Sequence, residues 1–110
     1  MSLDMSVVEW VAEAMAPVGT VSHRKMMGGA TLYLDGTIFA IVAADALWFK
    51  EDRESDATWD AEGAERFAMT DKNGRVMSVN YRRAPDDCLD DADALRRWAM
   101  MGHDAELRAR

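Results

Sequence analysis

A chain of 110 residues, of which 49% are apolar, can build one hydrophobic core and is too short for two ordinary domains. Its formal net charge of −7 disfavours binding to phosphate backbones unless the basic residues gather on one face. No apolar run approaches the roughly 20 residues that a membrane-spanning helix requires, and the single cysteine cannot form an internal disulfide. We therefore expect one cytoplasmic domain that has no membrane partner.

The chain begins with a helical pattern that is followed by strand patterns. Apolar residues recur at helical spacing from Val7 to Met15, and Pro17 and Gly19 end this helix. Four β-rich runs come next, joined by short turns: residues 20–26, 31–34, 37–42 and 47–50. Asp35-Gly36 separates the second run from the third and strongly indicates a hairpin, because both turn positions must tolerate positive φ. Links this short require antiparallel pairing, so the four runs are predicted to form a meander.

The second half of the chain predicts two helices and another hairpin. Residues 52–62 indicate a surface helix that packs through Ala57 and Trp59, and the last helix starts at Asp90 or Asp91 and ends or kinks at Gly102. The runs 67–69 and 76–81 lie between these helices and predict a second hairpin.

This order of elements predicts an α+β fold. We expect an antiparallel sheet built from a meander and a second hairpin, with N-terminal, middle and C-terminal helices packed on it. Residues 1–110 are predicted to be a single domain, in which residues 1–4 and 103–110 are disordered or derived from a tag.

The residues that usually carry chemistry are scattered. His23 and His103 lie far apart, and with one cysteine they do not supply the three or four ligands of a zinc site. Ser22 and His23 are neighbours on a predicted strand, so their side chains point to opposite faces. Cys88 lies in an acidic run, 86–91, which disfavours its thiolate. We predict no catalytic residues, no metal site and no cofactor.

Two basic pairs offer a different kind of site. Arg24-Lys25 and Arg82-Arg83 lie on separate predicted strands, and they would form a positive patch if those strands were neighbours. Alternatively, these side chains pair with nearby carboxylates and have only a structural role.

The first of these pairs belongs to a longer motif. Residues 24–30 (Arg-Lys-Met-Met-Gly-Gly-Ala), followed by Tyr33-Leu34-Asp35-Gly36 and Phe39-Ala40, resemble the N-terminal domain of the TfoX/Sxy family. The similarity covers roughly residues 5–101, and Met27 stands where that family usually has an aromatic residue. The resemblance implies a non-catalytic domain that acts through protein contacts in the transcriptional regulation of competence-type genes. Members of the family help a transcription factor, the cyclic-AMP receptor protein, to act at competence promoters.

The motif and the basic pairs together define a candidate interaction surface. It comprises Arg24, Lys25, Met27, Gly28, Gly29, Arg82 and Arg83. The expected partner is a protein such as a transcription factor, and exposed hairpin edges also leave a homodimer open. The alternative is direct nucleic-acid binding through the four basic residues of this set. A minor alternative is an uncharacterised small-ligand binder or enzyme, which a deep pocket holding a buried carboxylate or His23 would favour.

Overall fold

The computed structural model describes residues 5–26, 28–70 and 72–110, so Met27 of the candidate surface lies outside the described residues. The elements in chain order are α1 (Met5–Met15), β1 (Val21–Met26), β2 (Gly29–Leu34), β3 (Thr37–Ala43), β4 (Ala46–Lys50), α2 (Arg53–Ala61), β5 (Arg66–Thr70), β6 (Val76–Arg83), the short 3₁₀ helix η1 (Asp86–Leu89) and α3 (Ala92–Ala109). The predicted α+β fold is therefore confirmed. Among the described helices, none has the length and apolar character needed to cross a membrane.

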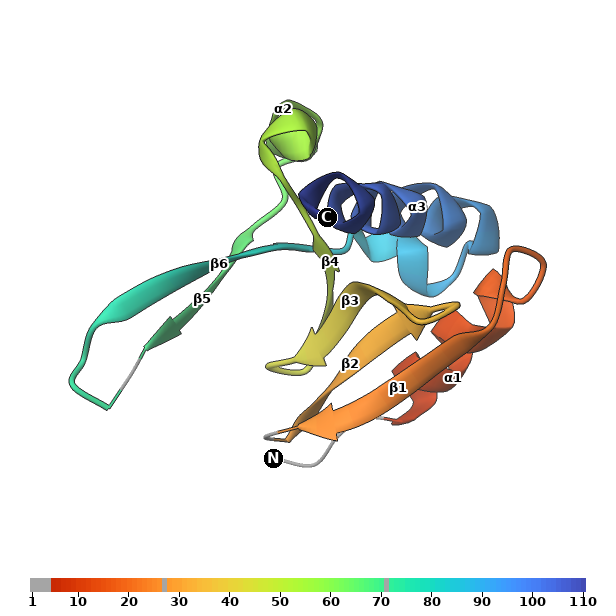
Figure 1. Ribbon diagram of the computed structural model, residues 1–110, viewed down its shortest axis with the longest axis horizontal. Helices are drawn as coiled ribbons and strands as arrows, with labels where there is room; N and C mark the ends of the chain where they lie inside the picture. The colour runs from red at the N-terminus through yellow and green to blue at the C-terminus, as the bar shows by residue number, and fades with distance from the viewer. Residues whose placement is uncertain (1–4, 27, 71) are drawn as a thin grey trace.

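One antiparallel sheet organises the molecule, with the strand order β1-β2-β3-β4-β6-β5. The first four strands form the predicted meander, and β6 joins the second hairpin to β4. Asp35 and Gly36 both have positive φ (48° and 85°), as the two-residue turn between β2 and β3 requires. The β5–β6 hairpin extends away from the rest of the sheet, and we call it the wing (Figure 1).

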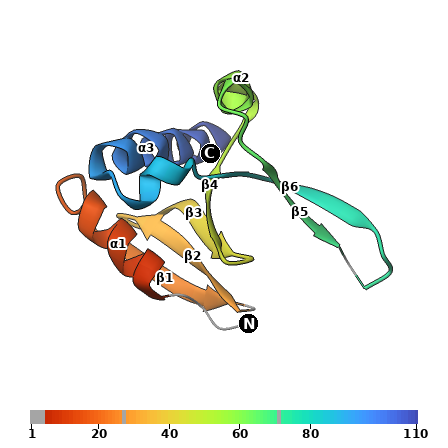
Figure 2. The same ribbon diagram turned by 180° about the vertical axis from the view of Figure 1, so that it is seen from behind.

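Helices cover one face of the meander and leave the other face open. Helices α1 and α3 lie on the same side of β1–β4, as Figures 1 and 2 show from opposite directions. The main core forms between them and the strands, and its largest buried side chains include Phe39, Phe49 and Trp59. Trp59 of α2 packs on Trp98 of α3 with ring centroids 4.6 Å apart, which attaches the middle helix to this core.

Two details of the helices differ from the predictions. In α2, Ser55 and Trp59 are buried while Ala57 is exposed, because the helix meets the core along a different stripe. Helix α3 begins at the predicted cap, Asp91, but it passes through Gly102 and continues to Ala109 instead of fraying. A Cβ atom at Gly102 would lie 2.5 Å from the carbonyl oxygen of Phe39, so glycine permits close helix–sheet packing here.

A groove on the open sheet face

The alternation of side chains along the strands creates the candidate site. A row of paired residues crosses the open face from one strand to the next: Arg24, Thr31, Ile41, Trp48 and Arg83. Ile41 and Trp48 belong to a small apolar cluster that is separate from the main core and that also contacts Phe67 and Tyr81. The open face of the sheet is thus apolar in the middle of the row and carries an arginine at each end.

A groove of about 800 Å³ lies over this face. The meander contributes Thr31, Ile38 and Ile41 to its lining, and the wing contributes Phe67, Val79 and Tyr81. The angle at which the wing leaves the sheet therefore gives the groove its second wall. This volume falls in the range of about 300–1,000 Å³ that is typical of small-molecule pockets. No carboxylate and no histidine is among the described residues that line it.

Contacts between meander and wing fix the walls of the groove. The rings of Trp48 and Phe67 meet edge to face with centroids 4.8 Å apart. The Trp48 indole N–H donates to the Ala43 carbonyl oxygen at 2.9 Å, which holds the indole in place. Trp48, which packs against the lining residue Phe67, therefore has its buried polar atom satisfied.

The polar groups of the groove are hydroxyls. Burial, followed by the nearby Glu106 carboxylate and Tyr33, raises the pKa of Tyr81 to about 12, so its hydroxyl stays protonated at neutral pH. Lys50 lies over the Tyr81 ring, with its ammonium nitrogen 5.8 Å from the ring centroid. The Thr31 hydroxyl donates to the Met26 sulfur at 3.2 Å. The hydroxyls of Tyr81 and Thr31 are neutral and can orient a ligand, but they do not form a nucleophile–base pair.

The two glycines of the sequence motif shape the mouth of the groove. Gly28 has a φ of 81°, a backbone conformation that side chains rarely adopt. A Cβ atom at Gly29 would lie 2.2 Å from the Val42 carbonyl oxygen, so only glycine lets β2 begin this close to β3. Both residues line the groove, and their role is to set the backbone path.

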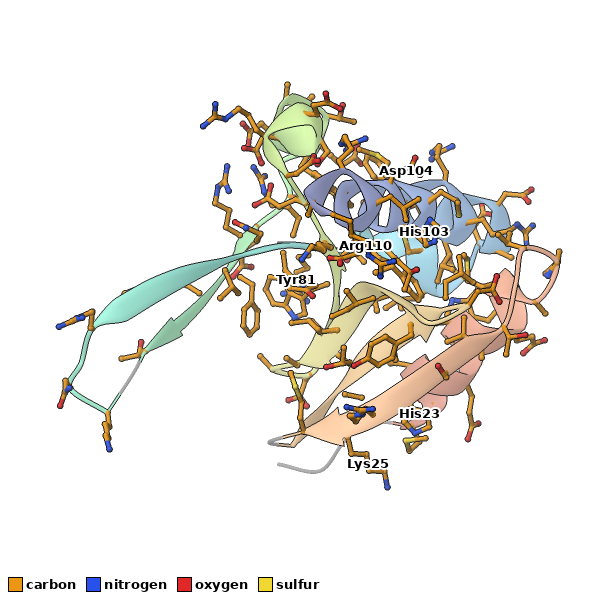
Figure 3. All side chains as sticks on the ribbon, in the orientation of Figure 1. His23, Lys25, Tyr81, His103, Asp104 and Arg110 are labelled. Atoms are coloured by element: carbon orange, nitrogen blue, oxygen red, sulfur yellow. The ribbon has the colours of Figure 1, made fainter. Side chains whose placement is uncertain are left out.

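The basic residues of the candidate surface do not come together. Arg24 and Arg83 lie on the open face, whereas Lys25 pairs with the core residue Ala30 and by strand alternation belongs to the opposite face. Figure 3 shows Lys25 and His23 along the outer strand β1, away from Tyr81. The positive patch that neighbouring strands would have formed is absent from the described residues, because β2, β3 and β4 separate β1 from β6.

Arg82 has a structural position. Its side chain is only 1% exposed and donates to Glu51 Oε2 at 2.8 Å, to Asp60 Oδ1 at 2.7 Å and to the Ala64 carbonyl oxygen at 3.0 Å. Arg66 of the wing donates to the other Glu51 oxygen at 2.6 Å. Arg82 therefore cannot present its guanidinium to a nucleic acid or a protein. For this residue the structure shows the alternative that the sequence left open, pairing with nearby carboxylates.

A partly exposed network around the buried pair Glu51–Arg82 joins the wing, the end of β4 and α2. Three carboxylates, those of Glu51, Asp56 and Asp60, meet the two guanidinium groups of Arg66 and Arg82. Burial is the main cause that raises the pKa of Glu51 to about 7, and its hydrogen bond with Asp56 adds to this. The nearby Glu51 is the first cause of a lowered pKa at Asp56, so the two neighbouring carboxyl groups shift in opposite directions. Sequence reasoning missed the network, although Glu51 directly after a strand run was a signal for it.

Other groups that could react or bind a ligand lie outside the groove. The Cys88 thiol is buried, and burial raises its pKa to about 12, which keeps it protonated and unreactive. Within the described ranges, no set of three His, Cys, Asp or Glu side chains is placed to hold a metal ion. A second hollow of about 370 Å³ between α2 and η1 has mainly polar walls.

A family model and one curated relative match most of the chain. The family model described as the TfoX N-terminal domain matches residues 13–106, a range that contains all six strands and the Arg82 network. Protein Sxy of Escherichia coli (strain K12) is 27% identical over 96 residues, which are 87% of this chain and 46% of Sxy. The chain thus spans about half the length of this curated relative. Since the family match covers nearly the whole fold, the chain belongs to the TfoX N-terminal domain family.

Proposed function

We propose that this protein is a non-catalytic cytoplasmic module that regulates transcription of competence-type genes by contacting another protein through the open-face groove. The observation that carries the proposal is the groove itself, an apolar surface between the meander and the wing that no helix covers. Large uncovered apolar surfaces on soluble domains usually mark binding sites. Membership of the TfoX N-terminal domain family and the similarity to Sxy support the regulatory context.

The charge distribution favours a protein partner over direct contact with nucleic acid. A duplex is held chiefly by several cations that face its phosphates together. Here Arg82 is buried, and Arg24 and Lys25 belong to opposite faces of an edge strand. The net charge of −7 further disfavours direct binding to a phosphate backbone. DNA would instead be bound by the partner, a transcription factor such as the cyclic-AMP receptor protein.

The proposal can be tested with purified components. Fluorescence anisotropy of a labelled competence-type promoter duplex is measured at physiological salt with the domain, with the receptor protein, and with both. The domain alone should leave the anisotropy unchanged, and it should increase the anisotropy of the receptor–DNA complex. Tight binding of the domain alone to the duplex would show that the proposal is wrong.

Two variants make this experiment specific for the groove. Ile38→Glu places a carboxylate in the groove lining and should abolish the effect on the receptor–DNA complex. Val18→Glu introduces the same charge at an exposed apolar residue outside the groove and should preserve it. Equal loss in both variants would indicate that net charge, and not the groove, determines the effect.

A further inference from the structure

We infer that the groove binds a polypeptide segment whose apolar side chains are flanked at both ends by carboxylates. This inference rests on the proposed function and names the chemistry of the partner that the groove would accept. Its basis is the cross-strand row in which an apolar floor, formed by Ile41 in the groove lining and by Trp48 beside it in the same cluster, lies between Arg24 and Arg83.

The described lining of the groove carries no charged side chain of either sign, although the chain is strongly acidic. The protein has 20 Asp and Glu residues against 13 Lys and Arg residues, yet no acid is among the described residues that line the groove. Many acids lie elsewhere, on α2 and in the run 86–93. A partner segment therefore meets an uncharged lining, and the arginines lie beyond it: Arg24 pairs across the strands with the lining residue Thr31, and Arg83 lies two positions after the lining residue Tyr81 on β6. Like charges on the rest of the domain repel an acidic segment that binds elsewhere.

Both arginines are available for a partner. Arg24 is exposed, and no ion pair joins it to another described residue, whereas Arg66, Arg82 and Arg108 all pair closely with carboxylates. Arg83 is 52% exposed, and its contact with Glu65, which is 65% exposed, is long, at 3.8 Å. Arg83 also lines the smaller hollow, together with Glu62, Glu65 and Asp86. An ion pair this loose and exposed contributes little, so Arg83 can exchange it for a partner carboxylate at small cost.

The spacing of the two arginines defines the length of the segment. Four strand intervals separate Arg24 on β1 from Arg83 on β6, which corresponds to about 19 Å at the usual strand spacing. An extended polypeptide covers this distance with about six residues. The segment should accordingly carry an apolar core of about this length between its acidic ends.

The chemistry of the groove distinguishes such a segment from other ligands. A nucleic acid would need a row of cations where the floor presents Ile41 and Trp48. The groove is partly open to solvent and has lining residues from the wing on one side, which lets an extended chain enter and leave.

The test uses two labelled synthetic peptides that share one apolar core of about six residues. One carries two glutamates at each end, and the other carries two lysines at each end. Fluorescence anisotropy with the full chain should show that the glutamate peptide binds at least about tenfold more tightly than the lysine peptide. The reason is that the arginines attract the glutamates and repel the lysines. Higher salt should reduce this preference.

Two single-residue variants provide a matched pair. Arg24→Glu should remove most of the preference for the glutamate peptide. Lys25→Glu changes the net charge equally at the next position of the same strand but on the opposite face, and it should preserve the preference. Circular dichroism and thermal unfolding of both variants confirm that they are folded.

Several results would overturn the inference. Equal affinity for the two peptides, or equal effects of Arg24→Glu and Lys25→Glu, would show that the arginines do not select for carboxylates. Light scattering that shows a dimer dissociated by Ile38→Glu, with neither peptide bound, would assign the groove to a second copy of the chain. Binding of oleate or duplex DNA in the groove without peptide binding would assign it to another ligand.

The peptide experiment and the promoter experiment can fail separately. If the domain still changes the receptor–DNA complex but does not discriminate between the peptides, only the inference about partner chemistry is wrong. If it discriminates between the peptides but does not act on the promoter complex, the transcriptional proposal is wrong and the groove chemistry stands.

Discussion

The guanidinium of Arg82 donates to the Glu51 carboxylate at 2.8 Å, and the two side chains are 1% and 2% exposed. Arg82 belongs to β6 of the wing, and Glu51 directly follows β4 of the meander. This pair therefore holds the wing at the position that gives the groove its second wall. Asp60 of α2 pairs with the same guanidinium at 2.7 Å, so the middle helix is fixed by the same arginine.

Replacing Arg82 should strongly destabilise the domain. Arg82→Met leaves Glu51 and Asp60 without their shared cation, and loss of one partner from a buried ion pair typically costs about 3–5 kcal/mol. Urea denaturation followed by tryptophan fluorescence measures the free energy of unfolding. The double variant Glu51→Gln with Arg82→Met should recover part of the loss, because one uncompensated charge is removed. A loss below about 1 kcal/mol in Arg82→Met would contradict a central role for this pair.

The raised pKa of Glu51 should make stability depend on pH. The pKa of Glu51 is raised from its ordinary value of 4.5 to about 7 in the folded state, mainly by burial. The folded protein thus binds more protons than the unfolded protein between these values. This contribution to the free energy of unfolding is fully present below about pH 4.5 and is lost as the pH rises through 7.

Urea denaturation at a series of pH values measures that dependence. Glu51→Gln should flatten the decline between pH 4.5 and 7, since the amide does not titrate. The variant Glu13→Gln, in which an exposed glutamate on α1 is replaced, should keep the decline of the original protein. A decline of the same steepness in Glu51→Gln would assign the pH dependence to another group.

Gly102→Ala should destabilise the protein although alanine is the better helix former. The added Cβ would lie 2.5 Å from the Phe39 carbonyl oxygen and 3.2 Å from the Lys50 backbone nitrogen, so α3 would have to move off the sheet. Overpacking of this kind costs about 1–3 kcal/mol, more than the gain in helix propensity. Thermal unfolding provides the measurement, with Asp104→Ala at an exposed position of the same helix as the control. An increased melting temperature for Gly102→Ala would contradict the close packing.

Cys88 should react only when the protein unfolds. Its thiol is buried, and its pKa is raised to about 12, so the reactive thiolate is scarce in the folded protein. Labelling with a chromogenic disulfide reagent at neutral pH should be slow in buffer and fast in concentrated urea. Equally fast labelling in buffer would show that the η1 region opens readily.

Local sequence rules were sufficient to predict the β2–β3 turn and the order of the helices and strands. Asp35-Gly36 predicted its hairpin because the need for positive φ depends only on the two turn residues. The short links likewise determined antiparallel pairing of the first four strands. The family motif also predicts the fold well, because its glycines, Gly28 and Gly29, are needed for the backbone path at the start of β2.

The candidate site was harder to predict because it depends on how distant elements meet. Whether Arg82 is exposed is decided by α2 and β4, which bring Asp60 and Glu51 to it from other parts of the chain. The groove exists because β6 pairs with β4 and not with β1, a choice that no local pattern determines. The prediction that the last helix ends or kinks at Gly102 is wrong, because the glycine is needed for close contact with Phe39, and such a tertiary contact leaves no local signal.

The central claim, that the open-face groove is the binding surface, is tested most directly by mapping where an acid-flanked peptide binds. Nuclear magnetic resonance spectra of the isotope-labelled domain, recorded during titration with the glutamate-flanked peptide, report on each backbone amide. The account predicts the largest shift changes at Thr31, Ile41 and Tyr81, which line the groove, with little change along α1. Changes confined to the helix-covered face, with the groove residues unaffected, would contradict it.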